Sequence, residues 1–379
     1  MAGVGRADDR SRYLERRRAV SVARSGSCRG TWARAGGYAL SGHDEAARYQ
    51  GRRGRLTPEF LFAVDVGGSS VKLGIVDGNG VVVAKSALPF RSLASFEALV
   101  EGAAESLDAL ARTVSAAPEA IGIAAPGYAD PATGLPLDGT GNVPLLKGGS
   151  LAAELARRLN VPAATDNDAI SATLGELEFG VGRRVSSFAL ITVGTGIGGA
   201  LVIDRRIVRG RDGKPPEFGA MVLEPGHPYE RYGLHGTFED LAGGKAVIAT
   251  YAAETGEAAE DLNMSLLRER ALAGDARADA AFETMGRYIA QAFGTMINLT
   301  AIELCVVGGG ISLAGGFLLD RIRRHLRANT WPYLFDDARI LATEHGNDSG
   351  LIGAAAMVRR RLNPVAGENV PVIKPSAFG

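Results

Sequence analysis

The chain of 379 residues contains only two cysteines, Cys28 and Cys305. Two thiols allow at most one disulfide within the chain, and they exclude a cysteine-rich structural zinc site. Cys305 lies in the apolar run IELCVV, where a buried and reduced thiol is the expected state.

Long apolar runs are also missing. None approaches the roughly eighteen residues that a membrane-spanning helix needs, and no apolar segment near the N-terminus resembles a signal-peptide core. Hydrophobic residues make up 46% of the chain and charged residues 22%, as in an ordinary globular protein. We therefore expect a cytoplasmic protein, without a membrane partner, that is long enough for two domains.

The net charge is zero, but the charges are unevenly distributed along the chain. Residues 1–55 hold thirteen arginines, no lysine and five acidic residues, so this segment carries +8 and the remainder −8. The segment has no sustained apolar period, and we expect residues 1–57 to be a poorly ordered or non-native basic extension. A basic arm for nucleic acid or an organellar presequence is the alternative.

Two similar strand-rich segments follow, about 125 residues apart. FLFAVDVGG, SVKLGIVD and VVVAKSAL predict a strand, a glycine turn and two further strands, and SSFALITV, GTGIGG, ALVID and RIVRG predict the same succession. Each set leads into a helical pattern and then into another apolar strand, AIGIAAPG or IELCVVGGG. The repeat predicts two related α/β lobes, each with helices covering a mixed sheet.

The second segment contains Gly194, Gly196 and Gly199 in the order G-x-G-x-x-G, which is typical of dinucleotide-binding turns. Such a turn must lead directly into a helix whose N-terminus receives the pyrophosphate, whereas ALVIDRRIV is another strand. The context therefore argues against NAD. These glycines either permit a tight hairpin or, because both lobes carry such loops followed by hydroxyl side chains, hold phosphate oxygens.

In this order, the motifs resemble those of the sugar kinases of the ROK family (repressors, uncharacterised reading frames and kinases), within the actin, hexokinase and Hsp70 ATPase superfamily. FAVDVGGSSVKLGIVD and LITVGTGIGGALV are similar to the two phosphate loops, TDNDAISATLGE to the catalytic segment, CVVGGGIS to the adenosine loop and GLIGAAAM to the closing helix. The resemblance extends from about residue 58 to 362.

The resemblance implies an α/β, two-lobed actin-like ATPase fold, a duplicated ribonuclease H-like unit with a cleft between the lobes. Residues 58–170 would form the N-terminal lobe and 171–347 the C-terminal lobe. Residues 348–365 would form a closing helix that returns to the first lobe.

The resemblance also implies an ATP-dependent carbohydrate kinase that uses Mg²⁺ and phosphorylates a hexose or related sugar, as a glucokinase does at the 6-hydroxyl. Asp168 would be the general base, although a helix N-cap is the alternative role for an aspartate at that place. Asp65 would lie near Mg²⁺ and act on it indirectly, whereas a solvated aspartate at a strand end is the alternative.

The remaining expected roles follow from the same motifs. The expected donor-binding residues are Asp65, Gly67, Gly68, Ser69, Ser70, Gly194, Thr195, Gly196, Gly308, Gly309 and Gly310. The expected sugar-binding residues are Gly127, Asn142, Asn167, Asp168, Glu217 and Glu239. Lys72 is left out, because exposed strand lysines are common. The three consecutive glycines from Gly308 would by themselves indicate only a flexible turn.

The sequence departs from the family pattern in one segment. Zinc-containing members carry E-x-G-H and then a cysteine-rich stretch that ends in G-C-x-E, but here Ala220 replaces the histidine and Thr237 a cysteine. His227 and His235 alone make a poor site, so we expect no structural zinc. Because the family histidine also contacts the sugar, glucose, mannose, fructose, an amino sugar or another polyol all stay open as the acceptor.

Two other functions are compatible with the family resemblance: a ROK-type sugar-responsive transcriptional regulator and a glucokinase that uses polyphosphate as the donor. Residues 1–55 show neither the apolar periodicity nor the two capped helices of a helix-turn-helix, so nucleic acid is not the expected partner. Family members are often dimers, and we expect a homodimer.

Overall fold

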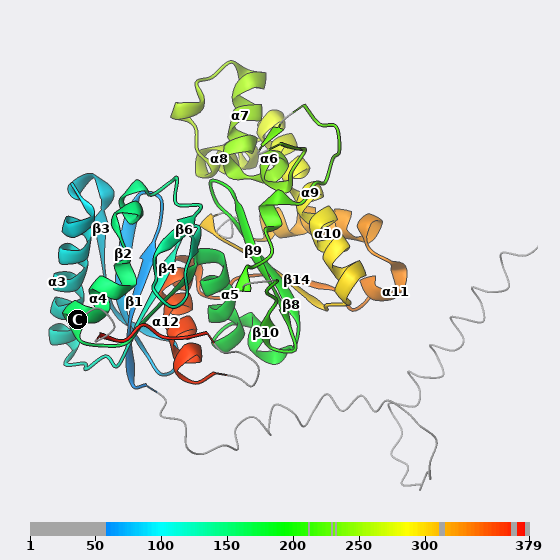
Figure 1. Ribbon diagram of the computed structural model, residues 1–379. Coiled ribbons are helices and arrows are strands. Elements are labelled where there is room, and N and C mark those ends of the chain that lie inside the picture. The colour runs from blue at the N-terminus through cyan, green and yellow to red at the C-terminus, as the bar shows by residue number, and fades with distance from the viewer. Residues whose placement is uncertain are drawn as a thin grey trace, which may run out of the picture. The chain divides into compact units, whose positions relative to one another are not determined.

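Two five-stranded mixed sheets with the same succession of strands form the framework of the protein (Figure 1). The computed structural model describes residues 58–375, apart from 211–212, 229, 232, 311–314 and 365–369. The prediction for residues 1–57 lies outside the described residues.

The first sheet has the order β3-β2-β1-β4-β7, in which the first three strands are antiparallel and the last two run parallel to β1. Side chains alternate along β1: Phe62 and Val64 pack in a different hydrophobic cluster from Leu61 and Ala63. Helices α3 and α4 cover the first face and α12 the second. The bounds are β1 (Phe60–Val66), β2 (Ser70–Asp77), β3 (Val82–Pro89), α3 (Phe96–Val114), β4 (Ile121–Ala125), α4 (Leu151–Leu159), β7 (Ala163–Asn167) and α12 (Ser349–Leu362).

The second sheet has the order β10-β9-β8-β13-β14 and repeats this pattern of antiparallel and parallel pairs. Helices α9 and α10 cover one face, and α5 and α12 the other. Cys305 on β13 is buried and free, as expected. The bounds are α5 (Asp168–Glu178), β8 (Phe188–Val193), β9 (Ile197–Ile203), β10 (Arg206–Ile207), α9 (Ala276–Thr300), β13 (Leu304–Gly308), α10 (Gly316–Asn329) and β14 (Arg339–Ala342). The predicted duplication is therefore confirmed.

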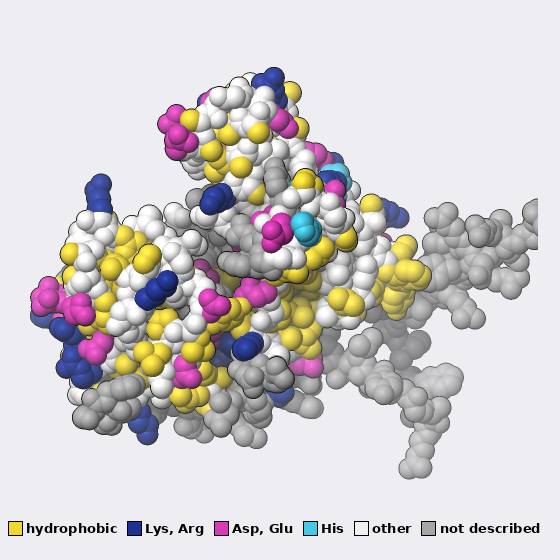
Figure 2. Space-filling view, turned by 45° about the horizontal axis from the view of Figure 1, so that its top comes forward, with side chains coloured by type: hydrophobic (Ala, Val, Ile, Leu, Met, Phe, Trp, Pro, Cys, Tyr) yellow, Lys and Arg dark blue, Asp and Glu magenta, His cyan; other side chains and the backbone are white. Residues whose placement is uncertain are grey.

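Smaller elements extend both halves. A hairpin of β5 (Tyr128–Ala129) and β6 (Pro136–Asp138) follows β4. Helices α6 (Phe238–Ala242), α7 (Gly244–Thr255) and α8 (Met264–Leu272) pack on α9. The short elements β11 (Glu230–Arg231), β12 (Leu234–His235) and α11 (Pro332–Phe335) complete the described chain. Among the described helices, none has the length and apolarity that crossing a membrane requires. On the face in Figure 2, positive and negative side chains are interspersed.

Helices α5 and α12 connect the two sheets, because their side chains and those of both sheets form one hydrophobic cluster. The two helices approach closely where Gly175 faces Gly353. A Cβ atom on Gly353 would lie 2.3 Å from the carbonyl oxygen of Ser171, a separation that real side chains essentially never show. The packing of the two halves therefore requires glycine at this crossing.

We predict that Gly353→Ala lowers the free energy of unfolding by about 1–3 kcal/mol, because the added methyl group forces the two helices apart. Guanidinium-induced unfolding followed by circular dichroism measures the change. Gly316→Ala is the matched control, since its Cβ would meet nothing closer than an Asp320 carboxylate oxygen at 3.8 Å. Equal transition midpoints for Gly353→Ala and the wild type would contradict the prediction.

Candidate active site

A broad cleft of about 3080 Å³, counting space open to solvent, is lined by strand ends and loops of both sheets. Most of the site residues predicted from the sequence line it: Gly67, Gly68, Ser69, Gly127, Asn142, Asn167, Asp168, Gly194, Thr195, Gly196, Glu217 and Glu239. The described lining residues do not include Asp65, Ser70, Gly308, Gly309 or Gly310.

The two glycine loops are tight hairpin turns that both face the cleft. The Gly67 N–H donates to the Ser70 carbonyl oxygen at 3.0 Å, and the Gly194 N–H donates to the Gly196 carbonyl oxygen at 3.0 Å. A Cβ on Gly68 or Gly194 would meet no atom within 4 Å, so both glycines border open space. Backbone of this kind can lie close to a ligand.

Helix α7 and Glu239 hold the second glycine loop from behind. The first N–H groups of α7, those of Gly244 and Lys245, donate to the carbonyl oxygens of Gly194 and Thr195 at 3.0 Å each. The Ile197 N–H donates to Glu239 Oε2 at 2.8 Å. A Cβ on Gly196 would lie only 2.3 Å from that oxygen. Glu239 thus supports the loop as well as lining the cleft.

Glu217 is exposed in the cleft and interacts electrostatically with Glu239. Partial burial raises the pKa of Glu217, and the negative charge of Glu239 raises it further. Two carboxyl groups in one region of the cleft give several acceptors for the hydroxyl groups of a polyol.

Asp168 and Asn167 lie where β7 runs directly into α5. The N-cap of α5 is Asn167, whose side chain accepts hydrogen bonds from the N–H groups of Ala169 at 3.0 Å and Ile170 at 3.3 Å. Its Nδ2 donates to the Gly127 carbonyl oxygen at 3.2 Å. Asp168 is the first residue of the helix and lines the cleft, so capping is not its role.

The Asp168 carboxyl group is exposed to the cleft, but protein surrounds that cleft on several sides. The resulting desolvation raises the pKa of Asp168 to about 6, and the nearby negative charge of Asp65 contributes to the increase. A hydrogen bond of 2.7 Å from the Ala169 N–H opposes it. Near neutral pH the group is thus ionised, yet it can accept a proton readily.

Asp65 lies at the end of β1, behind the first glycine loop, with its side chain 15% exposed. Lys72 Nζ donates to Asp65 Oδ2 at 3.2 Å and to the Asn347 carbonyl oxygen at 3.1 Å. A Cβ on Gly350 would lie 2.2 Å from the Asp65 carboxylate, so the first turn of α12 also contacts it. The β1–β2 register pairs Asp65 with Lys72, and this register was the signal by which Lys72 could have been recognised.

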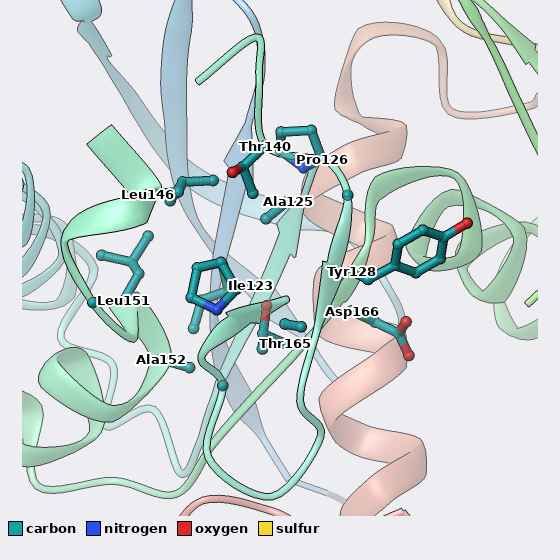
Figure 3. Close-up of a pocket in the computed structure, with 15 residues that line it drawn as sticks. Ile123, Ala125, Pro126, Tyr128, Thr140, Leu146, Leu151, Ala152, Thr165 and Asp166 are labelled. Carbon is teal, nitrogen blue, oxygen red and sulfur yellow. The ribbon is translucent and has the colours of Figure 1, made fainter. Parts of the chain in front are cut away.

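Gly127 and Asn142 belong to loops that line the same cleft as Asn167 and Asp168. Gly127 has φ of 80°, and a Cβ there would lie 2.2 Å from the Asp138 carbonyl oxygen, so the turn requires glycine. The turn borders a smaller hollow of about 380 Å³, counting space open to solvent, whose walls are mostly apolar (Figure 3). Asp166 lies at the edge of this hollow, and its carboxylate points toward α12 rather than toward Leu146 or Leu151.

Asp166, which the sequence marked only as a polar neighbour of Asp168, forms an ion-pair cluster. Its Oδ2 accepts hydrogen bonds from Arg209 Nη2 at 2.6 Å and from Arg361 Nη2 at 2.8 Å. Burial alone would raise the pKa of Asp166, but the two guanidinium groups hold it below its ordinary value. Because the arginines come from positions 43 and 195 residues away, no local pattern could have indicated them.

Strand β13 ends at Gly308, which pairs with Thr192 of β8, and Gly309 and Gly310 follow it. Gly309 has φ of 80°, and a Cβ on it would lie 2.4 Å from the Val193 carbonyl oxygen. The close approach of the two strand ends thus depends on this glycine. The role of the three glycines toward a nucleotide stays a prediction, because residues 311–314 lie outside the described range.

Leu223 and Glu224 lie in the segment where the sequence departs from the expected zinc motif, and hydrogen bonds from α9 hold this segment. Gln291 Nε2 donates to the Leu223 carbonyl oxygen at 2.9 Å, and the Tyr288 hydroxyl donates to Glu224 Oε2. Thr237 is the N-cap of α6. Within the described ranges, no three His, Cys, Asp or Glu side chains gather as metal ligands would. The absence of zinc stays a prediction.

Comparison with known proteins places the chain in a family. Residues 61–361 match the model of the ROK family. The chain is 29% identical to a glucokinase of Thermotoga maritima, an alignment that covers 80% of this chain and 98% of that protein.

Two solved structures support the same assignment. A ROK hexokinase of Thermus thermophilus superimposes with a TM-score of 0.67 at 27% identity, covering 78% of this chain and 97% of the other. A ROK family glucokinase of Streptomyces griseus, in complex with glucose and AMPPNP, gives 0.66 at 28% identity, covering 79% and 98%. The predicted two-lobed actin-like ATPase fold is confirmed. The chain belongs to the ROK family.

Proposed function

We propose that the protein is an ATP-dependent sugar kinase, and that it transfers the γ-phosphoryl group to a hydroxyl of a hexose, as a glucokinase does at the 6-hydroxyl. The observation that carries the proposal is Asp168, an accessible carboxylate with a pKa of about 6, in a cleft lined by both glycine loops. The similarity to glucokinases over nearly their whole length supports it.

The two glycine loops would bind the phosphates of the donor. Gly68 and Gly194 border open space that a Cβ would fill, and the hydroxyl groups of Ser69 and Thr195 line the same cleft. Loops of this kind provide N–H and hydroxyl donors for phosphate oxygens. Phosphoryl transfer depends chiefly on such positioning and on charge neutralisation.

The region near Asp65 has the donor chemistry that Mg²⁺ prefers. The carboxylates of Asp65 and Asp168 are close enough to interact electrostatically, and oxygen atoms of this type and bound water are the usual ligands of Mg²⁺. When bound, the ion would neutralise charge on the transferred phosphoryl group. Lys72 holds the Asp65 carboxylate in place.

Asp168 would accept the proton of the attacking sugar hydroxyl while that oxygen bonds to the γ-phosphorus. The bond between the γ-phosphorus and the β–γ bridging oxygen breaks, and ADP leaves. Asn167, Glu217 and Glu239 would hold other hydroxyl groups of the sugar and so orient the attacking one. Ala220 stands at the place of the family histidine and cannot make that residue's contact with the sugar. The loss of this contact can change which sugar is preferred, so the assay below uses a panel of sugars.

We predict that Asp168→Asn lowers kcat for the preferred sugar by about 10²–10⁴-fold, because the amide cannot accept the proton. A coupled assay of ADP release, with a panel of hexoses, amino sugars and polyols, identifies the acceptor and measures the loss. Asp108→Asn, an exposed change on α3, is the control.

Absence of turnover by the wild type on every sugar, with either ATP or polyphosphate as the donor, would refute the kinase proposal. Unchanged turnover by Asp168→Asn would refute the assignment of the base alone. Turnover with polyphosphate but not ATP would correct the donor.

The pH dependence of kcat/KM gives a separate prediction. The base acts in its ionised form, so kcat/KM falls as the pH drops through about 6, and at pH 5 about one tenth of the plateau value is left. Asp65→Asn removes a negative charge that raises the pKa of Asp168, and the midpoint therefore moves to lower pH. A midpoint that Asp65→Asn leaves in place would show that another group controls the profile. Asp108→Asn again serves as the control.

A further inference from the structure

A hollow of about 870 Å³, counting space open to solvent, lies beside Asp166. We call it the arginine hollow, because Arg206, Arg209, Arg360 and Arg361 line it together with Asp166. The other described lining residues are apolar, among them Leu174, Ile207 and Met357. Asn167 and Asp168, which follow Asp166 in the sequence, line the cleft described above and not this hollow.

Positive charge exceeds negative charge in this hollow. Arg209 and Arg361 both donate to the same oxygen, Asp166 Oδ2, so two guanidinium groups share one carboxylate. Arg360 pairs with Glu178 at 2.8 Å, and Arg206 is exposed. In the part of the chain that the structure describes, three of these guanidinium groups pair with the two carboxylates of Asp166 and Glu178, and Arg206 adds a fourth positive charge to the lining. Like charges at such short range repel each other strongly where water is partly excluded.

Arg361 has an unused donor. Its side chain is 7% exposed, and its Nη2 donates to Asp166 and to the Thr165 carbonyl oxygen at 2.8 Å each. Its Nη1 is buried and has no hydrogen-bond partner in the part of the chain that the structure describes. Burial lowers the pKa of Arg361, and the Asp166 carboxylate opposes that decrease. A buried donor without an acceptor is costly, so an added anionic oxygen would be stabilised here.

We propose that the arginine hollow binds a phosphate group, supplied by inorganic phosphate or by a phosphate monoester. A phosphate dianion offers several oxygens to guanidinium groups, which match its geometry with two parallel N–H donors. It would also neutralise the excess positive charge. The apolar part of the lining gives the organic portion of a monoester a surface to pack against.

The hollow is connected to the cleft through the chain on both sides. Asp166 Oδ1 accepts the N–H of Asn167 at 2.9 Å, and the segment after Arg209 leads to Pro215, Pro216 and Glu217 in the cleft. A phosphate held by Arg209 and Arg361 would compete with Asp166 for both. The inference goes beyond the proposed function and does not depend on it, because binding can be measured without turnover.

Isothermal titration calorimetry of the full chain tests the proposal, with inorganic phosphate and glycerol 3-phosphate as the two probes at constant ionic strength. We expect saturable binding by the wild type and a loss of about tenfold or more in affinity in Arg206→Gln and Arg209→Gln. Arg206 is exposed, so its replacement leaves the fold intact. Arg112→Gln, an exposed change on α3, is the matched control and keeps the wild-type affinity.

Asp166→Asn should raise the affinity for phosphate, because it removes the carboxylate that competes for Arg209 and Arg361.

Tighter binding of glycerol 3-phosphate than of phosphate would identify a monoester as the ligand, and equal binding would identify the phosphate group alone. No binding of either probe would overturn the proposal. Equal affinity in the wild type, Arg206→Gln and Arg209→Gln would overturn it too, since the phosphate would then sit in the cleft.

Discussion

The close crossing of α5 and α12 determines how the two sheets pack together. Gly353 and Gly175 let the two helix backbones meet, and the same helices fill the space between the two sheets. Because α5 begins at Asp168, this crossing also influences where Asp168 lies relative to the second glycine loop. The position of Asp168 in the cleft therefore depends on backbone packing about two helical turns away.

Three aspartates lie at or directly after the ends of β1 and β7. Their surroundings differ, so the same type of side chain has different properties at each position. Asp65 pairs with Lys72, and Asp166 with two arginines that keep its pKa low. Asp168 is desolvated and lies near the charge of Asp65, so its pKa rises instead. Asp168 thus has a raised pKa, whereas Asp65 and Asp166 form ion pairs with cationic side chains.

The family, the duplicated sheets and most of the cleft were predictable, because they follow from local patterns and the order of motifs. The residues of GTGIGG line the cleft as expected, and so do Asn167 and Asp168, because they lie at strand ends that border it. Other features depend on contacts between distant segments. Arg209 and Arg361 meet Asp166 only after both halves are assembled, and the support that Glu239 gives to the loop at Ile197 has no sequence signal. The N-cap of α5 is Asn167, whereas the sequence left capping open as the alternative role of Asp168. Sequence alone does not resolve a difference of one residue at a helix end.

The position of Glu239 has a consequence for how this site can evolve. Its carboxylate is bonded to Ile197 and lies against Gly196, so a replacement that altered sugar contacts would also disturb the loop proposed for the donor. Glu217 and Ala220 are exposed, and among the described contacts neither side chain supports the second glycine loop. Under the proposed function, new acceptor preferences can arise at positions 217 and 220 with little loss of donor binding. A change at position 239 would instead alter the acceptor contacts and the second glycine loop together.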